Sequence, residues 1–364
     1  MDKIKRFLDI YVPVTTCTLR CHYCYITQHR LFEGALPEFK YSPSHVRQAL
    51  SKTRLGGTCL INFCGGGETL LAPQMVEYVR ELLEEGHYVM IVTNATVSKR
   101  FDEMALFPKK LLSHLFFKFS YHYMELKKRN LIEIFFKNVC KMRDAGASFT
   151  LEATPSDELI PYISEMQQAA IDHVGAVNHI TVARDERVNG ELPILTKMNR
   201  EQYKKTWSVF KSEFFDYKMS IFGVKRKEFC YAGAWSLYIN LGTGVATQCY
   251  CSYFSQNIFE DISKPIKFKP VGNNCMQEHC YNGHAFLVLG LIPELSTPTY
   301  GEIRNRVCAD GSEWLKPEMK AFMSTKLYES NKQCSILKKL CVNAEIRLKK
   351  IISKITRNFY HHRY

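Results

Sequence analysis

The first 220 residues alternate short apolar segments, typical of β-strands, with longer segments that have the periodicity of amphipathic helices. We predict strands at residues 7–15, 58–64, 88–94, 115–121, 148–153 and 180–183. The predicted helices cover residues 42–54, 72–85, 99–106, 125–145, 156–174 and 200–217. Strict alternation of strand and helix implies a parallel sheet with helices on its outer face, so the sequence predicts an α/β fold.

Three cysteines directly follow the first predicted strand in the spacing C-x3-C-x2-C: Cys17, Cys21 and Cys24. This spacing offers three thiolates and stops one short of the four that would close a metal site. A [4Fe–4S] cluster held by three cysteines keeps one iron with an open position for a small molecule. Two alternatives remain open, a zinc site with His22 as fourth ligand and a disulfide in an oxidising compartment.

A glycine-rich turn closes the second predicted strand, where Gly65, Gly66 and Gly67 precede Glu68. Glycine lets the backbone approach a ligand closely, because there is no side chain in the way. The carboxylate of Glu68 offers a charge-assisted partner to an ammonium group. A turn of this kind is a weak signal alone, and its position about forty residues after the cysteine triplet makes it informative.

The triplet and the Gly-Gly-Glu turn together resemble the radical S-adenosylmethionine (SAM) superfamily. The resemblance implies a partial (β/α)6 TIM-like barrel with its active site at the carboxyl ends of the strands. It also implies that SAM chelates the open iron of a [4Fe–4S] cluster at Cys17, Cys21 and Cys24. One electron from the cluster then cleaves SAM to methionine and a 5′-deoxyadenosyl radical.

The same resemblance implies which other residues contact SAM. An aromatic residue before the third cysteine lies near the adenine, the Gly-Gly-Glu turn receives the amino group, and polar residues at later strand ends bind the rest. The residues at these positions are Tyr23, Gly66, Gly67, Glu68, Asn94, Ser120 and Arg184. The sequence does not identify a residue that donates or accepts a hydrogen atom.

Five further cysteines lie between residues 230 and 280: Cys230, Cys249, Cys251, Cys275 and Cys280. The pattern C-x13-G-x4-C resembles the entry hairpin of the SPASM and twitch annexes, with strands at 236–240 and 244–248 around a glycine-containing turn. We predict one auxiliary [4Fe–4S] cluster with Cys230, Cys249, Cys275 and Cys280 as ligands and Cys251 as a substitute. Four thiolates leave no open iron, so this cluster would transfer electrons. A zinc site and scattered structural cysteines are the alternatives.

The C-terminal residues 335–364 carry eight Lys or Arg against one acidic residue, Glu345. Apolar residues recur there at helical spacing, which predicts an amphipathic basic helix. They are Leu337, Leu340, Ala344, Leu348, Ile351, Ile352, Ile355 and Phe359. Three interpretations remain open: a helix packed on the barrel, a membrane-surface helix, and a contact with an acidic partner. We recognise no nucleic-acid-binding module and expect no nucleic acid partner.

The sequence divides into a predicted barrel at 1–222, a cysteine-rich annex at 223–300 and a helical extension at 301–364. Apolar residues make up 46% and charged residues 23% of the chain, as in ordinary globular proteins. No signal peptide is evident, and the longest uncharged apolar run, residues 285–293, is too short to span a membrane. We therefore expect a cytoplasmic protein, with peripheral membrane association as an option.

These features predict a radical SAM enzyme that abstracts a substrate hydrogen atom, with the auxiliary cluster as electron acceptor. The annex resemblance places modification of a peptide or protein first, by cross-linking, epimerisation or oxidation. Dehydrogenation or epimerisation of a small molecule such as a sugar or cyclitol is the alternative. A non-enzymatic iron–sulfur or zinc protein is a third interpretation. The resemblance also implies an electron donor such as flavodoxin or ferredoxin.

Overall fold

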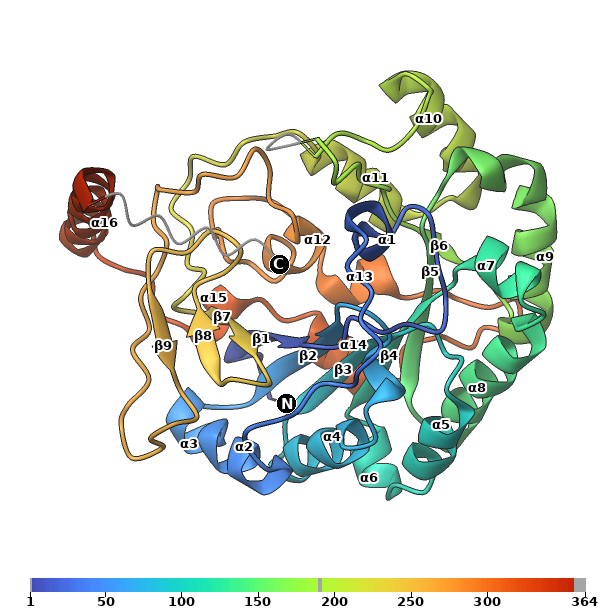
Figure 1. The fold of residues 1–364 in the computed structure, drawn as a ribbon, viewed down its shortest axis with the longest axis horizontal. Helices are drawn as coiled ribbons and strands as arrows, with labels where there is room; N and C mark the ends of the chain where they lie inside the picture. The colour runs from blue at the N-terminus through green and yellow to red at the C-terminus, as the bar shows by residue number, and fades with distance from the viewer. Residues whose placement is uncertain (1, 189–191, 357–364) are drawn as a thin grey trace.

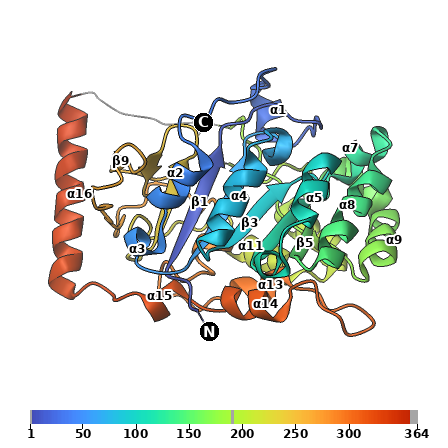
Figure 2. The same cartoon turned by 90° about the horizontal axis from the view of Figure 1, so that it is seen from below.

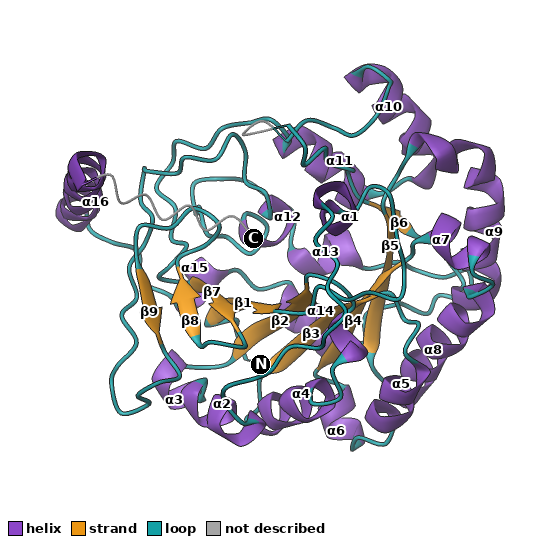
Figure 3. Cartoon of the chain, viewed as in Figure 1, coloured by secondary structure: helices purple, strands orange, loops and turns teal. Residues whose placement is uncertain are grey.

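Six parallel strands form the central sheet of the computed structural model, which describes residues 2–188 and 192–356. Neighbours in sequence are neighbours in the sheet. The strands are β1 (Arg6–Val12), β2 (Cys59–Gly65), β3 (Tyr88–Thr93), β4 (Leu115–Ser120), β5 (Ser148–Ala153) and β6 (His179–Ile180). The sheet curves without closing, which confirms the predicted α/β fold and partial barrel (Figures 1 and 3).

Helices cover the outer face of this sheet (Figure 1). Apolar side chains at alternate strand positions, such as Leu8, Ile61 and Phe117, point outward into the core beneath these helices. The outer helices and short 3-10 turns are α2 (Pro43–Ala49), α3 (Lys52–Leu55), η1 (Thr69–Leu71), α4 (Met75–Glu84), α5 (Ser98–Ala105), α6 (Lys109–Leu112), α7 (Tyr123–Lys128), α8 (Ile132–Ala145), η2 (Asp157–Tyr162) and α9 (Ile163–Val174). The helices that follow β6 are α10 (Arg200–Trp207), η3 (Ser208–Phe210) and α11 (Glu213–Ile221).

Several predicted helices are interrupted. The helix predicted over 125–145 is two helices, because Asn130 adopts a left-handed backbone with φ 56°. Lys211, with φ 43°, ends the first part of the segment predicted over 200–217, and the Ser212 side chain then caps α11. Ser51 likewise begins α3 as a cap after α2. The apolar residues keep the same helical periodicity on both sides of each break, so the sequence pattern did not predict where these helices end.

The annex joins the edge of the barrel sheet. Strand β7 (Ser236–Asn240) pairs parallel to β1, β8 (Val245–Thr247) pairs antiparallel to β7, and β9 (Ser255–Asn257) pairs antiparallel to β8. The predicted hairpin of β7 and β8 is therefore confirmed, and together with β9 it extends the barrel sheet to nine strands among the described residues. This pairing places the annex beside the cysteine loop that follows β1.

The inner face of the sheet divides into two levels. Phe7, Met90 and Phe116 lie near the amino ends of their strands and form a second apolar core. That core is completed by α12 (Gly283–Phe286), α13 (Tyr300–Arg304), α14 (Pro317–Met323) and α15 (Leu327–Ser330). Figure 2 shows α14 and α15 near the chain's amino terminus, opposite α1 (Tyr25–His29) of the cysteine loop. Polar residues remain on the inner face nearer the carboxyl ends.

The C-terminal helix α16 (Ile336–Thr356) stands at one side of the molecule (Figure 2). It contacts the annex through Asn343, which forms hydrogen bonds with Asn273, and its Ile346 side chain is buried. Leu337, Leu340 and Leu348 face away and are 75%, 60% and 59% exposed. These leucines of the predicted apolar stripe therefore do not pack on the barrel. The side chains of Ile351, Ile352, Ile355 and Phe359 lie outside the described part of the chain.

No helix among the described residues is long and apolar enough to cross a membrane.

Candidate active site

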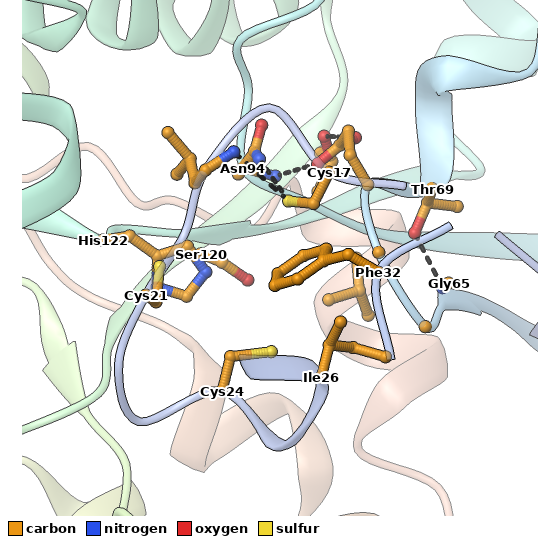
Figure 4. Close-up of a pocket in the computed structure, with 16 residues that line it drawn as sticks. Cys17, Cys21, Cys24, Ile26, Phe32, Gly65, Thr69, Asn94, Ser120 and His122 are labelled. Carbon is orange, nitrogen blue, oxygen red and sulfur yellow. Dashed lines mark hydrogen bonds between the residues drawn. The ribbon is translucent and has the colours of Figure 1, made fainter. Parts of the chain in front are cut away.

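The cysteine loop between β1 and α1 lies over the carboxyl ends of β1 to β4. Its three thiols line one cavity of about 80 Å³, and Cys21 is only 5% exposed. Figure 4 shows Cys17, Cys21 and Cys24 around this space together with the ring of Phe32. The other lining residues come from the ends of β2, β3 and β4 and include Gly65, Gly66, Gly67, Glu68, Thr69, Thr93, Asn94, Ser120 and His122.

The glycine-rich turn fits directly beneath the cysteine loop. A Cβ atom at Gly67 would lie 2.0 Å from the carbonyl oxygen of Thr16, and one at Gly66 would lie 2.9 Å from that of Val14. The amide of Glu68 donates a hydrogen bond to Thr16 at 3.0 Å. Only glycine permits this approach, so these residues determine how closely the loop sits on the strands.

Glu68 connects the ends of β2 and β3. Its carboxylate accepts hydrogen bonds from the Leu70 amide at 3.0 Å, the Thr93 hydroxyl at 2.6 Å and the Asn94 amide at 2.8 Å. Burial raises the pKa of Glu68, and these three donors oppose the rise. The sequence predicts a ligand contact for this carboxylate, and the structure shows that it also holds Asn94 in place.

Asn94 in turn contacts the cysteine loop. Its side-chain amide donates to the Cys17 sulfur at 3.6 Å and to the Thr18 hydroxyl at 2.9 Å. The Leu19 amide donates to the same sulfur at 3.4 Å. Burial raises the pKa of Cys17 to about 11 and also raises the pKa values of Cys21 and Cys24. A cationic centre among these thiols would favour their thiolate forms.

Two of the predicted SAM contacts line a second cavity. Tyr23 and Arg184 border a space of about 310 Å³ inside the barrel, and Cys24 and His122 line both cavities. The Tyr23 hydroxyl forms a hydrogen bond with Nδ1 of His122 at 2.8 Å. The first cavity thus brings together the three cysteines, Gly66, Gly67, Glu68, Asn94 and Ser120, whereas Tyr23 and Arg184 line the second.

His22 does not line the cysteine cavity. Its Nε2 atom lies 3.1 Å from the Glu158 carboxylate on the surface. The geometry therefore does not support His22 as a fourth zinc ligand.

The annex cysteines also lie close together. Besides burial, the charges of Cys230, Cys275 and Cys280 raise the pKa of Cys249, and burial raises that of Cys230 to about 12. Cys251 is buried beside them, where its amide donates to the Cys249 sulfur at 3.2 Å. A hydrogen bond from Cys275 lowers the pKa of Cys251.

Among the described residues, no three or more His, Cys, Asp or Glu side chains form a group that could hold a metal ion. The thiolates of a four-iron cluster each bind a different iron, so they are spread around the cluster and do not converge on one ion.

Sequence reasoning missed the charged residues inside the barrel. Lys118 on β4 and Lys218 on α11 line the larger cavity, and Arg304 on α13 pairs behind it with Glu152 of β5. A lysine in the otherwise apolar segment Leu115–Ser120 was the available signal for Lys118. Nothing in the local pattern around residues 218 or 304 indicated the barrel interior.

Comparison with known proteins agrees with this geometry. Residues 11–153 match the Radical SAM superfamily. Streptococcus suis SuiB bound to S-adenosylmethionine shares the fold, with TM-score 0.51 and 14% identity, over 71% of this chain and 64% of SuiB. This chain therefore spans less than two thirds of SuiB.

Two further solved structures are similar at lower scores. SuiB bound to the precursor peptide SuiA gives TM-score 0.47 and 16% identity, over 71% of this chain and 63% of that one. The structure of anSMEcpe with bound AdoMet and Cp18Cys peptide gives TM-score 0.42 and 12% identity, over 96% and 99%. Comparison with curated protein sequences found no match.

The matched segment contains the cysteine loop, the glycine-rich turn and the ends of β2 to β4. The match to the Radical SAM superfamily thus covers every residue that lines the cysteine cavity.

Proposed function

We propose that this chain is a radical SAM enzyme, with a [4Fe–4S] cluster held by Cys17, Cys21 and Cys24 and SAM bound beside it. The observation that carries the proposal is one cavity at the carboxyl ends of the strands, lined by three thiols and the Gly-Gly-Glu turn. Three sulfur donors leave one iron open, which suits chelation by a small molecule. When bound, the cluster supplies the electron that cleaves SAM, and the resulting 5′-deoxyadenosyl radical takes a hydrogen atom from the substrate.

The protein's own part in this reaction is to position and enclose these groups. Gly66 and Gly67 permit the close approach of the cysteine loop, and Glu68 fixes Asn94. Asn94 and the Leu19 amide direct donors at the Cys17 sulfur, which favours its thiolate. Ser120 at the end of β4 lies in the same cavity as a polar partner for SAM. Tyr23 and Arg184 line the adjoining cavity and are proposed to contact the adenine and the carboxylate of SAM.

The annex is proposed to hold one auxiliary [4Fe–4S] cluster through Cys230, Cys249, Cys275 and Cys280. Support comes from the proximity of these four partly buried thiols. Besides burial, the charges of Cys230 and Cys275 raise the pKa values of both Cys249 and Cys280. A cluster with four thiolates has no open iron and serves to accept an electron from the substrate. Cys251 is close enough to replace one of the four.

The substrate is proposed to be a peptide, because enzymes with this kind of annex most often act on peptides. The modification would be a cross-link, an epimerisation or an oxidation. Radical chemistry on a sugar or cyclitol is the second candidate. Product mass distinguishes the reactions, since a cross-link or dehydrogenation removes two hydrogen atoms and an epimerisation leaves the mass unchanged. Flavodoxin or ferredoxin would supply the electron.

The direct test is SAM cleavage by the anaerobically reconstituted protein with dithionite as reductant. We expect 5′-deoxyadenosine from the wild type and none when Cys17, Cys21 and Cys24 are all replaced by Ala. Cys341→Ala on the exposed surface is the matched control and should cleave SAM as the wild type does. Cleavage by the triple variant would refute the assignment.

We also propose that α16 binds an anionic membrane surface. Its outward face carries Leu337, Leu340 and Leu348, and the exposed cations Lys338 and Arg347 lie beside these leucines. Two copies of this helix would bring like charges together, whereas acidic lipid headgroups complement them. The excess of basic over acidic residues between 335 and 364 also favours an anionic surface.

Vesicle sedimentation tests this contact. The protein should sediment with vesicles that contain phosphatidylglycerol and much less with pure phosphatidylcholine. A variant with Leu340→Gln and Leu348→Gln should lose most of the binding, and Val209→Gln, an exposed apolar residue elsewhere, should keep it. No binding by the wild type, or its self-association through α16, would refute the membrane assignment.

A further inference from the structure

The larger cavity contains a group of cationic side chains. It extends from Cys24 and His122 toward the annex, and three cationic side chains line it. They come from three separate elements: Lys118 from β4, Arg184 from the segment after β6, and Lys218 from α11.

The carboxylates of the cavity do not balance these cations. Glu152, 4% exposed, pairs with Lys118 at 3.1 Å and is shared with the fully buried Arg304. Glu186 pairs with Arg184 at 2.9 Å.

Asp9, the third carboxylate, accepts hydrogen bonds from neutral groups: the amides of Asn62 and Asn282 and the Tyr250 hydroxyl. Four cations, counting Arg304, thus face three carboxylates in and behind the cavity.

Lys218 is the cation left without a carboxylate. Among the described residues it forms no salt bridge, and its ammonium group donates to the Thr181 hydroxyl at 2.6 Å. The ammonium also lies 5.5 Å from the ring centroid of Phe214. Lys218 is only partly buried, and its ammonium group has two further N–H donors that can bind a group in the cavity.

The electrostatic field agrees with this geometry. Burial lowers the pKa of Lys218, and the charges of Arg184 and Lys118 lower it further. Burial and the charge of Arg304 lower the pKa of Lys118 to about 7. Burial lowers the pKa of His284, which lines the same cavity, and the charges of both lysines and Arg184 lower it further. One bound anion would relieve all of these repulsions together.

We propose that Lys218, with Lys118, binds a carboxylate group of the substrate in this cavity. The inference rests on the proposed function, because the cavity opens at Cys24 and the substrate must reach the radical there. A single surplus cation matches the single charge of a carboxylate. In a peptide substrate this group is an acidic side chain or the C-terminus. The carboxylate of SAM is a second group that fits this site, so the test must distinguish the SAM carboxylate from a substrate carboxylate.

Binding of capped amino acids to the reconstituted protein provides that test. N-acetyl-glutamate amide carries one carboxylate, and N-acetyl-glutamine amide is its neutral isostere. Calorimetric titration should show binding of the glutamate compound at least tenfold tighter than that of the glutamine compound. Lys218→Met and Lys118→Met should each reduce the glutamate affinity at least tenfold. Lys205→Met, an exposed lysine on the preceding helix, should leave it unchanged.

Two controls keep the result interpretable. Thermal unfolding shows whether each variant is folded, and Lys118→Met tests the site independently if Lys218→Met is not. SAM is titrated in parallel: loss of SAM affinity in Lys218→Met, without discrimination between the capped amino acids, would assign the cations to SAM and overturn the proposal. Equal affinity of the wild type for both capped amino acids would also overturn it. Wild type that binds glutamate selectively but does not cleave SAM would retain the anion site and refute only the radical reaction.

Discussion

Replacing Glu68 by Ala should destabilise the fold as well as weaken SAM binding. The carboxylate accepts hydrogen bonds from Leu70, Thr93 and Asn94, and it is buried. Hydrogen bonds to charged groups contribute about 1.5–3 kcal/mol each. Their contributions are not additive, and the desolvation that raises the pKa of Glu68 offsets part of them. We therefore expect a loss of about 3 kcal/mol from the free energy of unfolding.

Glu68→Gln separates the contribution of the charge from that of the shape. Gln keeps one carbonyl oxygen and the volume, and it places an amide donor against one of the three donors. Its expected cost is about half that of Ala, roughly 1.5 kcal/mol. Glu77→Ala, an exposed residue of α4, is the matched control and should change stability by less than about 0.5 kcal/mol.

Urea unfolding of the three variants without ligand measures these differences, and calorimetry gives the SAM affinity. Because Glu68 holds Asn94, and Asn94 contacts Cys17, iron retention should also fall in Glu68→Ala. An unchanged urea midpoint together with weakened SAM binding would refute this reasoning, since the carboxylate would then act on the ligand alone.

Three other predictions concern the metal content, the glycine turn and the barrel charge. Reconstituted wild type should hold about eight irons and the Cys17/Cys21/Cys24 variant about four, measured by iron analysis. Replacing Cys275 and Cys280 should also leave about four irons, and a wild-type value near four would exclude the auxiliary cluster. Gly67→Ala should lose iron and SAM binding because its Cβ would lie 2.0 Å from the Thr16 carbonyl oxygen, whereas Gly34→Ala, with no atom within 4 Å, should keep both. The folded pKa of Lys118, about 7, lies below its ordinary value of 10.5, so between these values the unfolded chain binds a proton that the native protein does not. This residue's contribution to stability therefore rises with pH through that window, and Lys118→Met should flatten the rise measured by urea unfolding; an unchanged slope would contradict the shift.

Local pattern was sufficient to predict the strands and the cysteine cavity. Buried parallel strands are short apolar runs, and all six were located within three residues at each end. Cys17 and Glu68 were identified because the chemistry of each motif is contained in a few consecutive residues. The helix breaks at Asn130 and Lys211 were missed because a single left-handed residue interrupts a helix without changing its apolar periodicity.

The sequence did not predict which distant segments of the chain contact one another. Nothing near residue 236 indicates that β7 pairs with β1, because strand pairing depends on backbone groups that every residue carries. The ion pair between Arg304 and Glu152 joins residues from two predicted domains, and neither segment alone identifies its partner. The charged interior of the barrel was missed for this reason.

The pair between Arg304 and Glu152 also determines the charge of the larger cavity. Glu152 has one carboxylate for two cations, Arg304 and Lys118. Without Arg304 it would neutralise Lys118 alone, and the cavity would lose its surplus positive charge. The segment after the annex therefore does more than cover the apolar inner core of the barrel. Through α13 it sets the electrostatic field where the substrate is proposed to bind, so the three predicted segments contribute to one site.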